Sequence, residues 1–436
     1  MRKIIFAIYT LVSGLSISAL TQDQPLTLHD AIEIGLKNNY AIQISRNEAE
    51  IEANNYALGN AGFLPSIDVN ASASKSIADA NQEFITGNKI KRDGAETKSI
   101  NGGVALSWTL FDGLRMFTTF GRLRDLKEMG EVQFKNELEN TLAQIIIAYS
   151  DVVQQQLGIA ALQDAVTISR ERIRIARGKY NIGTESKLEL NQATVAFNAD
   201  SSALLRQEIT LATAKVNLNE LLNRDELLDF QTDDSLAIEK ELAFENLYKM
   251  MMENNNLLAL AKTDISLAQR NLRAYRAERL PELDLNASYN YSKSESDAGF
   301  LLTNETTSKN LALSLRMNLF NGFNTTRNIQ NAKIEKRNSE LNFESIKNQI
   351  SAELATTFRR YQNSLQVVDL EQDNIKLARQ NVDIALQQFR LGSITSVELR
   401  DVQNNFIESE ARLIRAEFEA KVAETDLLRL SGQLIQ

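Results

Sequence analysis

Apolar and polar residues alternate in four segments of the chain, at residues 66–75, 100–111, 282–291 and 310–320. In the second segment, for example, Val104 and Leu106 lie on one face, and Ser107 and Thr109 lie on the other. A period of two over about ten residues predicts a β-strand, and a tilted strand of this length can cross a membrane. The polar stretches 76–99 and 292–309 between them predict two β-hairpins with long loops.

The rest of the chain has the periodicity of long helices. A seven-residue repeat kept over several heptads predicts coiled-coil-like packing along a helix rather than a compact core. Residues 113–180 would span about 100 Å as one helix, and we expect the chain to turn at Gly183 and return over residues 186–222. Heptads alone would also be satisfied by a soluble coiled coil. The two matching apolar seams are Val152, Ile159, Val166, Ile173 and Tyr180, and Tyr361, Val368, Ile375, Val382 and Phe389.

The order of motifs indicates a tandem duplication. The Leu-Pro pair at residues 64–65 returns at 280–281, and the Leu-Phe-Asp-Gly motif at 110–113 returns as Leu-Phe-Asn-Gly at 319–322. Self-similarity kept in order over such a length is typical of a structural repeat. We therefore predict a first repeat at residues 22–222, a linker at 223–243 and a second repeat at 244–436, each with one hairpin of strands and one hairpin of helices.

Four strands are too few to close a membrane barrel. Lipid offers no hydrogen-bond partners to strand edges, and the smallest membrane barrels have about eight strands. The chain must then oligomerise, with two copies giving eight strands and three giving twelve. The alternative is a soluble antiparallel sheet with one wet face.

The two faces of the strands differ in chemistry. The polar face carries Asp68, Asp284 and Arg316, which suit a water-filled lumen. For Asp68 and Asp284, capping of the strand entrance is an equal alternative. The opposite face carries the aromatic residues Trp108, Tyr289 and Tyr291, which suit the girdles at the two surfaces of a bilayer.

Composition narrows the class of protein. The 436 residues include 48 basic and 57 acidic residues, which give a formal net charge of -9, and no cysteine. The charge disfavours nucleic acid as a partner, and the missing thiols exclude disulfides and thiolate metal sites. A mean hydropathy of -0.28 disfavours a bundle of membrane helices.

The N-terminus has the pattern of a secretory signal peptide. Arg2 and Lys3 precede an apolar run from Ile4 to Leu20 that ends in small residues, so we expect residues 1–21 to be removed. A permanent N-terminal anchor helix is the alternative. Because no cysteine follows the run, an N-terminal lipid-modified cysteine is excluded.

The sequence gives no sign of an enzyme or of a bound cofactor. His29 is the only histidine, and it lies at the start of an expected helix, where a helix-end polar residue is the simpler interpretation. No cluster of metal ligands and no glycine-rich phosphate loop before a helix is found. We therefore expect no catalytic residue, no metal and no cofactor.

The duplicated order resembles the TolC family of outer-membrane efflux and secretion channels. The resemblance covers essentially the whole mature chain and includes the opening at residues 26–31, both pairs of repeated motifs, and Gly183 and Gly392 at the helical turns. It implies a mainly α fold with membrane β-barrel strands. Three copies would form a twelve-stranded barrel in outer-membrane lipid and an α-helical barrel in the periplasm.

The resemblance also implies a function. Such a homotrimer is the exit duct of a tripartite efflux pump or a type I secretion system, and exports drugs, other small molecules or proteins. Its partners would be a periplasmic adaptor (membrane fusion) protein and an inner-membrane transporter of the RND, ABC or MFS type. A non-conducting structural or adhesion protein of the cell envelope, built on helical hairpins, is the alternative.

The family closes its tunnel at the periplasmic tip with rings of acidic residues. The matching positions are Asp401 and Glu398, with Glu189 as the counterpart of Glu398 in the first repeat. In a trimer these carboxylates would form rings that select cations. Glu189 and Glu398 also fit capping boxes, and Asp401 also fits a plain solvated aspartate.

Two positions depart from the family pattern. Gln192 stands where the first repeat would carry its second acid, and Ile394 stands where the family has a locking arginine. Whether the tip locks as in the family is therefore open at this point. The residues that match the family's adaptor-contact tips are Asn181, Gly183, Arg390 and Gly392.

Overall fold

The computed structural model describes residues 25–233, 235–298 and 301–435 and contains eight helices and four strands within those ranges. The predicted signal peptide lies outside them. In chain order the elements are α1 (Leu28–Asn38), α2 (Tyr40–Asn55), β1 (Ser66–Glu83), β2 (Lys89–Asp112), α3 (Arg115–Asn181), α4 (Lys187–Leu221), α5 (Phe244–Asn254), α6 (Asn256–Ala277), β3 (Glu282–Ser296), β4 (Thr303–Arg316), α7 (Asn324–Leu391) and α8 (Ser396–Leu430).

The chain divides into two compact units. We call Met1–Asn39, Gln144–Lys240 and Tyr361–Glu424 the tip unit, and Tyr40–Ala143, Glu241–Arg360 and Thr425–Gln436 the sheet unit. The helices α3, α7 and α8 each contribute residues to both. Among the described residues, α3 is the one helix long and apolar enough to cross a membrane, a test that a packed coiled-coil helix also passes.

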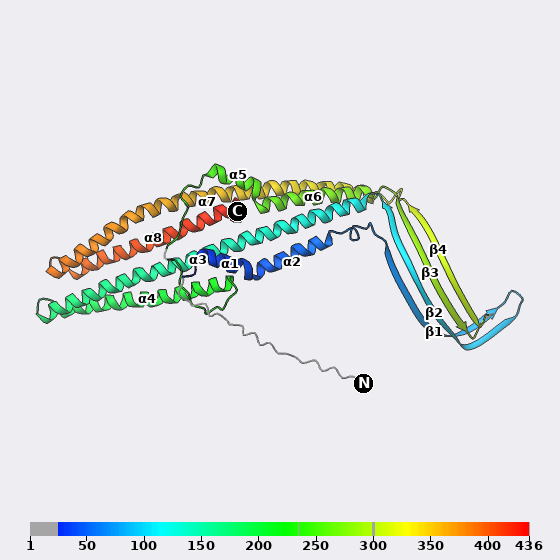
Figure 1. The fold of residues 1–436 in the computed structure, drawn as a ribbon, viewed down its shortest axis with the longest axis horizontal. Helices are drawn as coiled ribbons and strands as arrows, with labels where there is room; N and C mark the ends of the chain where they lie inside the picture. The colour runs from blue at the N-terminus through cyan, green and yellow to red at the C-terminus, as the bar shows by residue number, and fades with distance from the viewer. Residues whose placement is uncertain (1–24, 234, 299–300, 436) are drawn as a thin grey trace, which may run out of the picture. The chain divides into compact units, whose positions relative to one another are not determined.

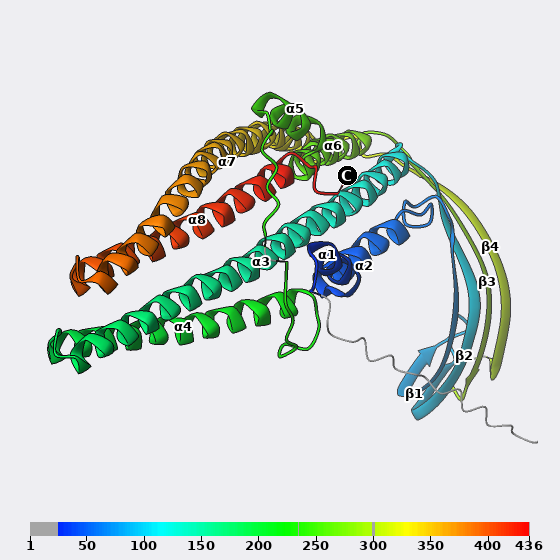
Figure 2. The same ribbon diagram turned by 60° about the vertical axis from the view of Figure 1, so that its left-hand side comes forward.

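The sheet unit holds one four-stranded antiparallel sheet in the order β1-β2-β3-β4 (Figure 1). The four strands bend together as one curved layer, as Figure 2 shows. The predicted loop at 76–99 is wrong, because β1 and β2 stay paired as far as Glu83 and Lys89. In the other hairpin, pairing continues to Glu295 and Thr303. The sequence hides these extensions because both faces are polar there, so the apolar alternation disappears while the backbone pairing does not.

The pairing of the strands determines which residues lie on each face of the sheet. Asp284 pairs with Thr109 on β2, whose hydroxyl donates to the carboxylate at 2.8 Å. Arg316 pairs with Glu282 across β3 and β4, and Asp68 shares the same face. Trp108 pairs with Leu285 on the opposite, apolar face, which also carries Tyr289 and Tyr291.

A sharp turn joins β2 to α3. Gly113 has a φ of +71°, and a Cβ at this position would lie 2.6 Å from the carbonyl oxygen of Ala277. The Asp112 carboxylate accepts a hydrogen bond from the backbone N–H of Met116 at 3.0 Å, which caps the first turn of the helix. Gly113 therefore has a structural role at this turn, since only a residue without a side chain fits.

Deeper in the sheet unit, a buried ion pair joins α3 to α6. The Arg270 guanidinium donates two hydrogen bonds to Asp125, and Ser266 donates a third at 2.6 Å. Burial acts to raise the pKa of Asp125, but these hydrogen bonds and the arginine's charge outweigh it and hold the pKa below its ordinary value. The carboxylate is thereby kept charged and paired.

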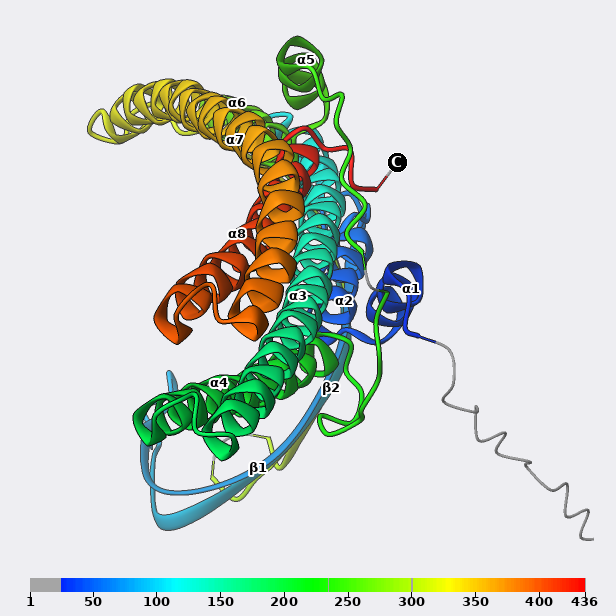
Figure 3. The same ribbon diagram turned by 90° about the vertical axis from the view of Figure 1, so that its left-hand side faces the viewer.

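The tip unit contains two helical hairpins, α3–α4 and α7–α8, whose helices lie side by side in Figures 2 and 3. The apolar seam predicted on α7 is buried at Tyr361, Val368, Val382 and Phe389, and half-buried at Ile375. On α3 the seam is buried at Val152 and Val166, but Tyr180 near the turn is exposed. Each hairpin turns at a glycine with positive φ, Gly183 or Gly392, as a helix C-cap requires.

Candidate gate site

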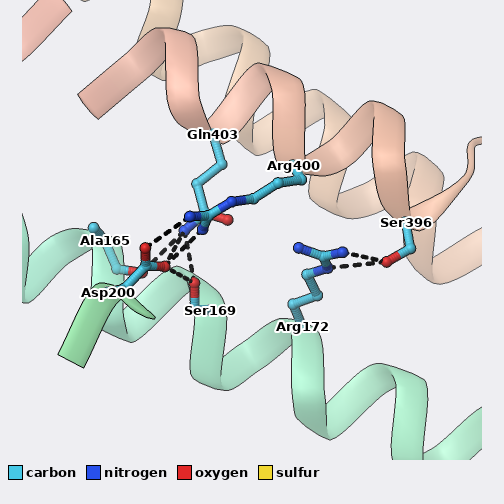
Figure 4. A network of polar contacts seen from close by, with 7 residues as sticks. All are labelled: Ala165, Ser169, Arg172, Asp200, Ser396, Arg400 and Gln403. Atoms are coloured by element: carbon cyan, nitrogen blue, oxygen red, sulfur yellow. Dashed lines mark hydrogen bonds and ion pairs between the residues drawn. The ribbon is translucent and has the colours of Figure 1, made fainter. Parts of the chain in front are cut away.

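In the tip unit, α4 of one hairpin and α8 of the other are joined by a buried ion pair (Figure 4). Two nitrogens of the Arg400 guanidinium bind the two oxygens of Asp200 at 2.7 and 2.8 Å. The Asp200 side chain is 8% exposed and that of Arg400 is 24% exposed. A bidentate pair of this kind is both strong and geometrically selective, so it fixes the register of α8 against α4.

Two buried neutral side chains complete the pair, and we call Ser169, Asp200, Arg400 and Gln403 the latch. The Ser169 hydroxyl donates to Asp200, and the Gln403 amide donates to Ser169 at 2.8 Å and to the carbonyl oxygen of Ala165 at 3.1 Å. Ser169 and Gln403 are fully buried. The latch therefore ties three helices together, with α3 and α4 on one side and α8 on the other.

Next to the latch lies a buried arginine whose hydrogen bonding is incomplete. Arg172 on α3 donates through Nε and Nη2 to the hydroxyl of Ser396, the first residue of α8. Within the described residues, its Nη1 and the Oε2 of Glu189 are both buried without a hydrogen-bond partner. Burial lowers the pKa of Arg172, and the charge of nearby Arg400 lowers it further. The packed arrangement thus leaves the Arg172 guanidinium and the Glu189 carboxylate each with a buried atom that lacks a hydrogen bond. Unpaired buried polar atoms of this kind cost free energy.

Polar residues follow the buried side of α8 every seven positions. Burial raises the pKa of Glu417 and Glu424, and raises that of Glu410 to about 7 with a contribution from the charge of Asp164. Asp164 itself pairs with Arg379 of α7 at 2.7 Å. The series is Ser396, Gln403, Glu410, Glu417 and Glu424. A seam with this composition gains less from burial than an apolar one, so it separates at lower cost.

The three predicted acidic residues have different surroundings. The Glu398 carboxylate accepts from the backbone N–H and the hydroxyl of Thr395 at 2.7 and 2.9 Å, which completes the capping box and lowers its pKa. For Glu189, the hydroxyl of Ser186 caps the helix, but the glutamate carboxylate does not reach back. Asp401 lies exposed on α8, directly after Arg400 of the latch. The structure therefore gives Glu398 a capping role and leaves Asp401 facing solvent in the single chain.

The predicted tip residues lie at the two turns. Asn181, Gly183, Arg390 and Gly392 are all exposed. Arg390 also binds Glu171 of α3 at 3.0 Å, so it joins the two hairpins within the tip unit. Hydrogen bonds from Arg174 and Arg390 lower the pKa of Glu171.

Sequence reasoning missed the latch, although a signal for it was present. Asp200 lies on a seven-residue series of α4 with Ala193 and Ala214, both of which are buried. A charged residue at such a position needs a partner in the core. Ser396 and Gln403 form the matching series on α8, and Arg400 lies one turn after Ser396 on the same helix.

Comparisons with known proteins agree with this architecture. The family model described as outer membrane efflux protein matches residues 31–224 and 247–433. The outer membrane efflux protein BepC of Brucella suis is 21% identical over 408 residues, which cover 94% of this chain and 86% of BepC. The proteases secretion protein PrtF of Dickeya chrysanthemi is 21% identical over 422 residues, which cover 94% of this chain and 89% of PrtF. The crystal structure of the Campylobacter jejuni outer membrane channel CmeC superposes with a TM-score of 0.78 at 15% identity, covering 99% of this chain and 93% of CmeC.

Proposed function

Because the chain belongs to the outer membrane efflux protein family, we propose that three copies of it form the exit duct of an efflux pump or a secretion system. The protein is located in the cell outer membrane with its helical part in the periplasm, and its family consists of efflux channels rather than enzymes. Our proposal concerns the number of copies, the gate residues, the partners and the cargo.

The observation that carries the proposal is a sheet with one polar face, one apolar face and two open edges. β1 and β4 each have a neighbour on one side only. In hydrocarbon an unpaired strand edge leaves a row of backbone N–H and C=O groups without partners, so the edges must meet those of other copies. Three copies supply twelve strands, whose polar faces, with Asp68, Asp284 and Arg316, line the lumen. The apolar faces, with Trp108, Tyr289 and Tyr291, then meet lipid.

The helices of the tip unit also support assembly. Leu370, Leu377, Ile384 and Leu391 lie seven residues apart on α7 and are between 53% and 81% exposed. Leu188, Val195 and Ile209 form a similar exposed series on α4. Exposed apolar seams at heptad spacing are typical of helices that pack against further helices. A second copy of the chain is the partner that offers matching seams of the same spacing.

The latch supports a gate formed by the α7–α8 hairpin. Three copies of Asp401 would form a ring of like charge that favours cations and narrows the tunnel. Moving α8 away from α4 requires the Asp200–Arg400 pair to break. Glu189 would take part in the opening through its neighbour Arg172. Glu398 stabilises the first turn of α8 by capping it.

The relatives indicate what kind of system this duct serves. PrtF is a proteases secretion protein, CusC of Escherichia coli is a cation efflux system protein, and BepC is an efflux protein. We propose for this chain a periplasmic adaptor that contacts the turns at Gly183 and Gly392, and an inner-membrane transporter of the RND, ABC or MFS type. The exported cargo is a small molecule or a protein.

The test is planar-bilayer conductance of the purified, detergent-solubilised protein, as wild type and as Asp401→Ala. We expect a cation-selective conductance that grows and loses selectivity in the variant. No conductance in either protein, or in a variant with the latch opened, would leave a non-conducting envelope protein as the better account. An unchanged conductance in Asp401→Ala alone would remove that residue from the gate and leave the duct intact.

A further inference from the structure

A lysine follows the apolar band on every strand of the sheet. On the apolar face, the band ends at Ala73 on β1, Ile100 on β2, Tyr291 on β3 and Leu311 on β4. The next residue on that face, towards the hairpin turns, is Lys75, Lys98, Lys293 and Lys309 respectively. We call these four residues the lysine belt.

Strand pairing places the whole belt on one face. Lys75 pairs directly with Lys98, which in turn pairs with Glu295. Lys293 pairs with Ile100, and Lys309 pairs with Tyr289 of the apolar face. At the same level the polar face carries neutral residues instead, including Ser74, Ser99, Ser294 and Ser308. At this level of the sheet the lysines are thus confined to the apolar face.

The position of the belt is level on β1 and β2 and then shifts on β3 and β4. Lys293 lies two residues nearer to the helices than the β3 residue that pairs with Lys98. Lys309 lies four residues nearer to the helices than the β4 residue that pairs with Lys293. Strands of membrane barrels tilt by roughly 35–45°, so a plane parallel to the bilayer crosses neighbouring strands at shifted positions. The three steps are zero, two and four residues, and none runs in the opposite direction, as strand tilt requires.

The belt lysines remain open to a further ligand. Lys75 binds Glu96 at 2.6 Å and Lys293 binds Glu295 at 2.7 Å, yet their side chains are 50% and 37% exposed. An ammonium group has three donors, so a lysine that already binds one carboxylate can bind a phosphate as well. The apolar stem of a lysine can lie along a hydrophobic surface while its charge reaches the polar layer.

We propose that the lysine belt binds the phosphate groups of lipids in the outer leaflet of the outer membrane. The belt lies on the side of the apolar band away from the periplasmic helices, so it faces the outer leaflet. At the helix end of the strands, the neighbouring positions of the same band are Pro65 and Pro281 rather than lysines. The inference rests on the proposed function in one respect, namely that the apolar face of the sheet meets lipid.

The experiment compares lipid binding by the detergent-solubilised full-length protein and by a variant with all four belt lysines changed to Gln. The probes are bisphosphorylated lipid A, the same lipid after removal of both phosphates, and inorganic phosphate, with thermal unfolding followed during each titration. We expect the wild type to bind the phosphorylated lipid at least tenfold more tightly than the dephosphorylated one. The Gln variant should lose this preference, since each basic residue near an anionic surface contributes roughly fivefold.

Three further proteins make the result decisive. A variant with all four belt lysines changed to Arg should keep the preference, and a variant with Lys135, Lys187, Lys249 and Lys333 changed to Gln should behave as wild type. If the four-Gln protein does not fold, the pair Lys98→Gln and Lys309→Gln should still lower the preference. These two lysines form no ion pair among those seen in the described residues.

The proposal would be overturned if the four-Gln variant kept the wild-type preference for the phosphorylated lipid. It would also be overturned if inorganic phosphate stabilised the protein against thermal unfolding as much as the phosphorylated lipid does. Conductance in a bilayer without phosphorylated lipid separates this inference from the proposed function. If the lipid preference is absent but the wild type conducts, the lipid-binding proposal is refuted and the proposed duct is retained. If the wild type does not conduct, the proposed duct is refuted.

Discussion

Asp200→Asn is the substitution that tests the latch most directly. It removes one charge and keeps the size of the side chain, so the hydrogen bonds from Ser169 and Gln403 have an acceptor oxygen left. Removing one partner of a buried ion pair costs about 3–5 kcal/mol, because the other charge stays buried. Arg400 is 24% exposed and can regain some water, which lowers the cost to about 2 kcal/mol.

A change of about 2 kcal/mol shifts the closed-to-open ratio roughly 30-fold per protomer. The assay is single-channel recording in planar bilayers, with the fraction of time spent open as the readout. Asp369→Asn is the matched control, because Asp369 pairs with Lys240 at 3.5 Å on the exposed surface of the same unit. Exposed pairs contribute about 0–1 kcal/mol, so the control should gate as wild type does.

The coupling between the two latch residues is measured with Arg400→Gln and the double variant. If the ion pair holds the gate, the double variant should open no more often than either single variant. Strictly additive effects of the two substitutions would show that Asp200 and Arg400 act separately. An open fraction for Asp200→Asn equal to that of Asp369→Asn would show that the latch does not oppose opening.

Three other predictions concern packing, assembly and the β2–α3 turn. Burial raises the pKa of Glu410 above its ordinary value, to about 7, so the folded state is favoured when this carboxyl is protonated, and that advantage is lost as the pH rises from about 4.5 through 7. Glu410→Gln should therefore raise the free energy of unfolding by about 1–3 kcal/mol at pH 8 and leave it unchanged near pH 4, as urea titration at both pH values will show. Leu377→Glu places a charge on the exposed α7 seam and should yield monomers in light scattering, whereas Lys376→Glu beside it should not. Gly113→Ala should cost at least 2 kcal/mol in thermal unfolding because its Cβ would meet backbone, whereas Gly183→Ala, with open space around it, should cost only about 1 kcal/mol of backbone strain.

The sequence was sufficient to predict the elements that bury apolar residues in a regular period. The strand alternation and the seam from Tyr361 to Phe389 are both direct consequences of which face avoids water. The prediction from the sequence failed in the segments where this apolar period stops. The outer halves of β1 and β2 are wet on both faces, and only their backbone hydrogen bonds, which every residue except proline can form, keep them as strands.

The candidate site was harder to predict than the fold for a different reason. Asp200 and Arg400 are 200 residues apart in the chain, and each alone looks like an ordinary charged residue of a helix. Their partnership depends on the relative rotation of two hairpins, which heptad spacing constrains but does not fix. The capping role of Glu398 was easier to foresee, because all of its partners lie within three residues.

Ile394, which departs from the family pattern, lies in apolar surroundings. Where an arginine was expected, Ile394 packs against a buried cluster made of Ile175, Ala385, Phe389 and Leu399 at the end of the tip unit. An arginine there would place its charge against these apolar side chains. Six residues further on, Arg400 meets Asp200, a buried acid that needs a cation. The apolar cluster therefore packs the turn, and the Asp200–Arg400 pair joins α8 to α4. In the proposed gate, this pair sets the free energy at which α8 leaves α4.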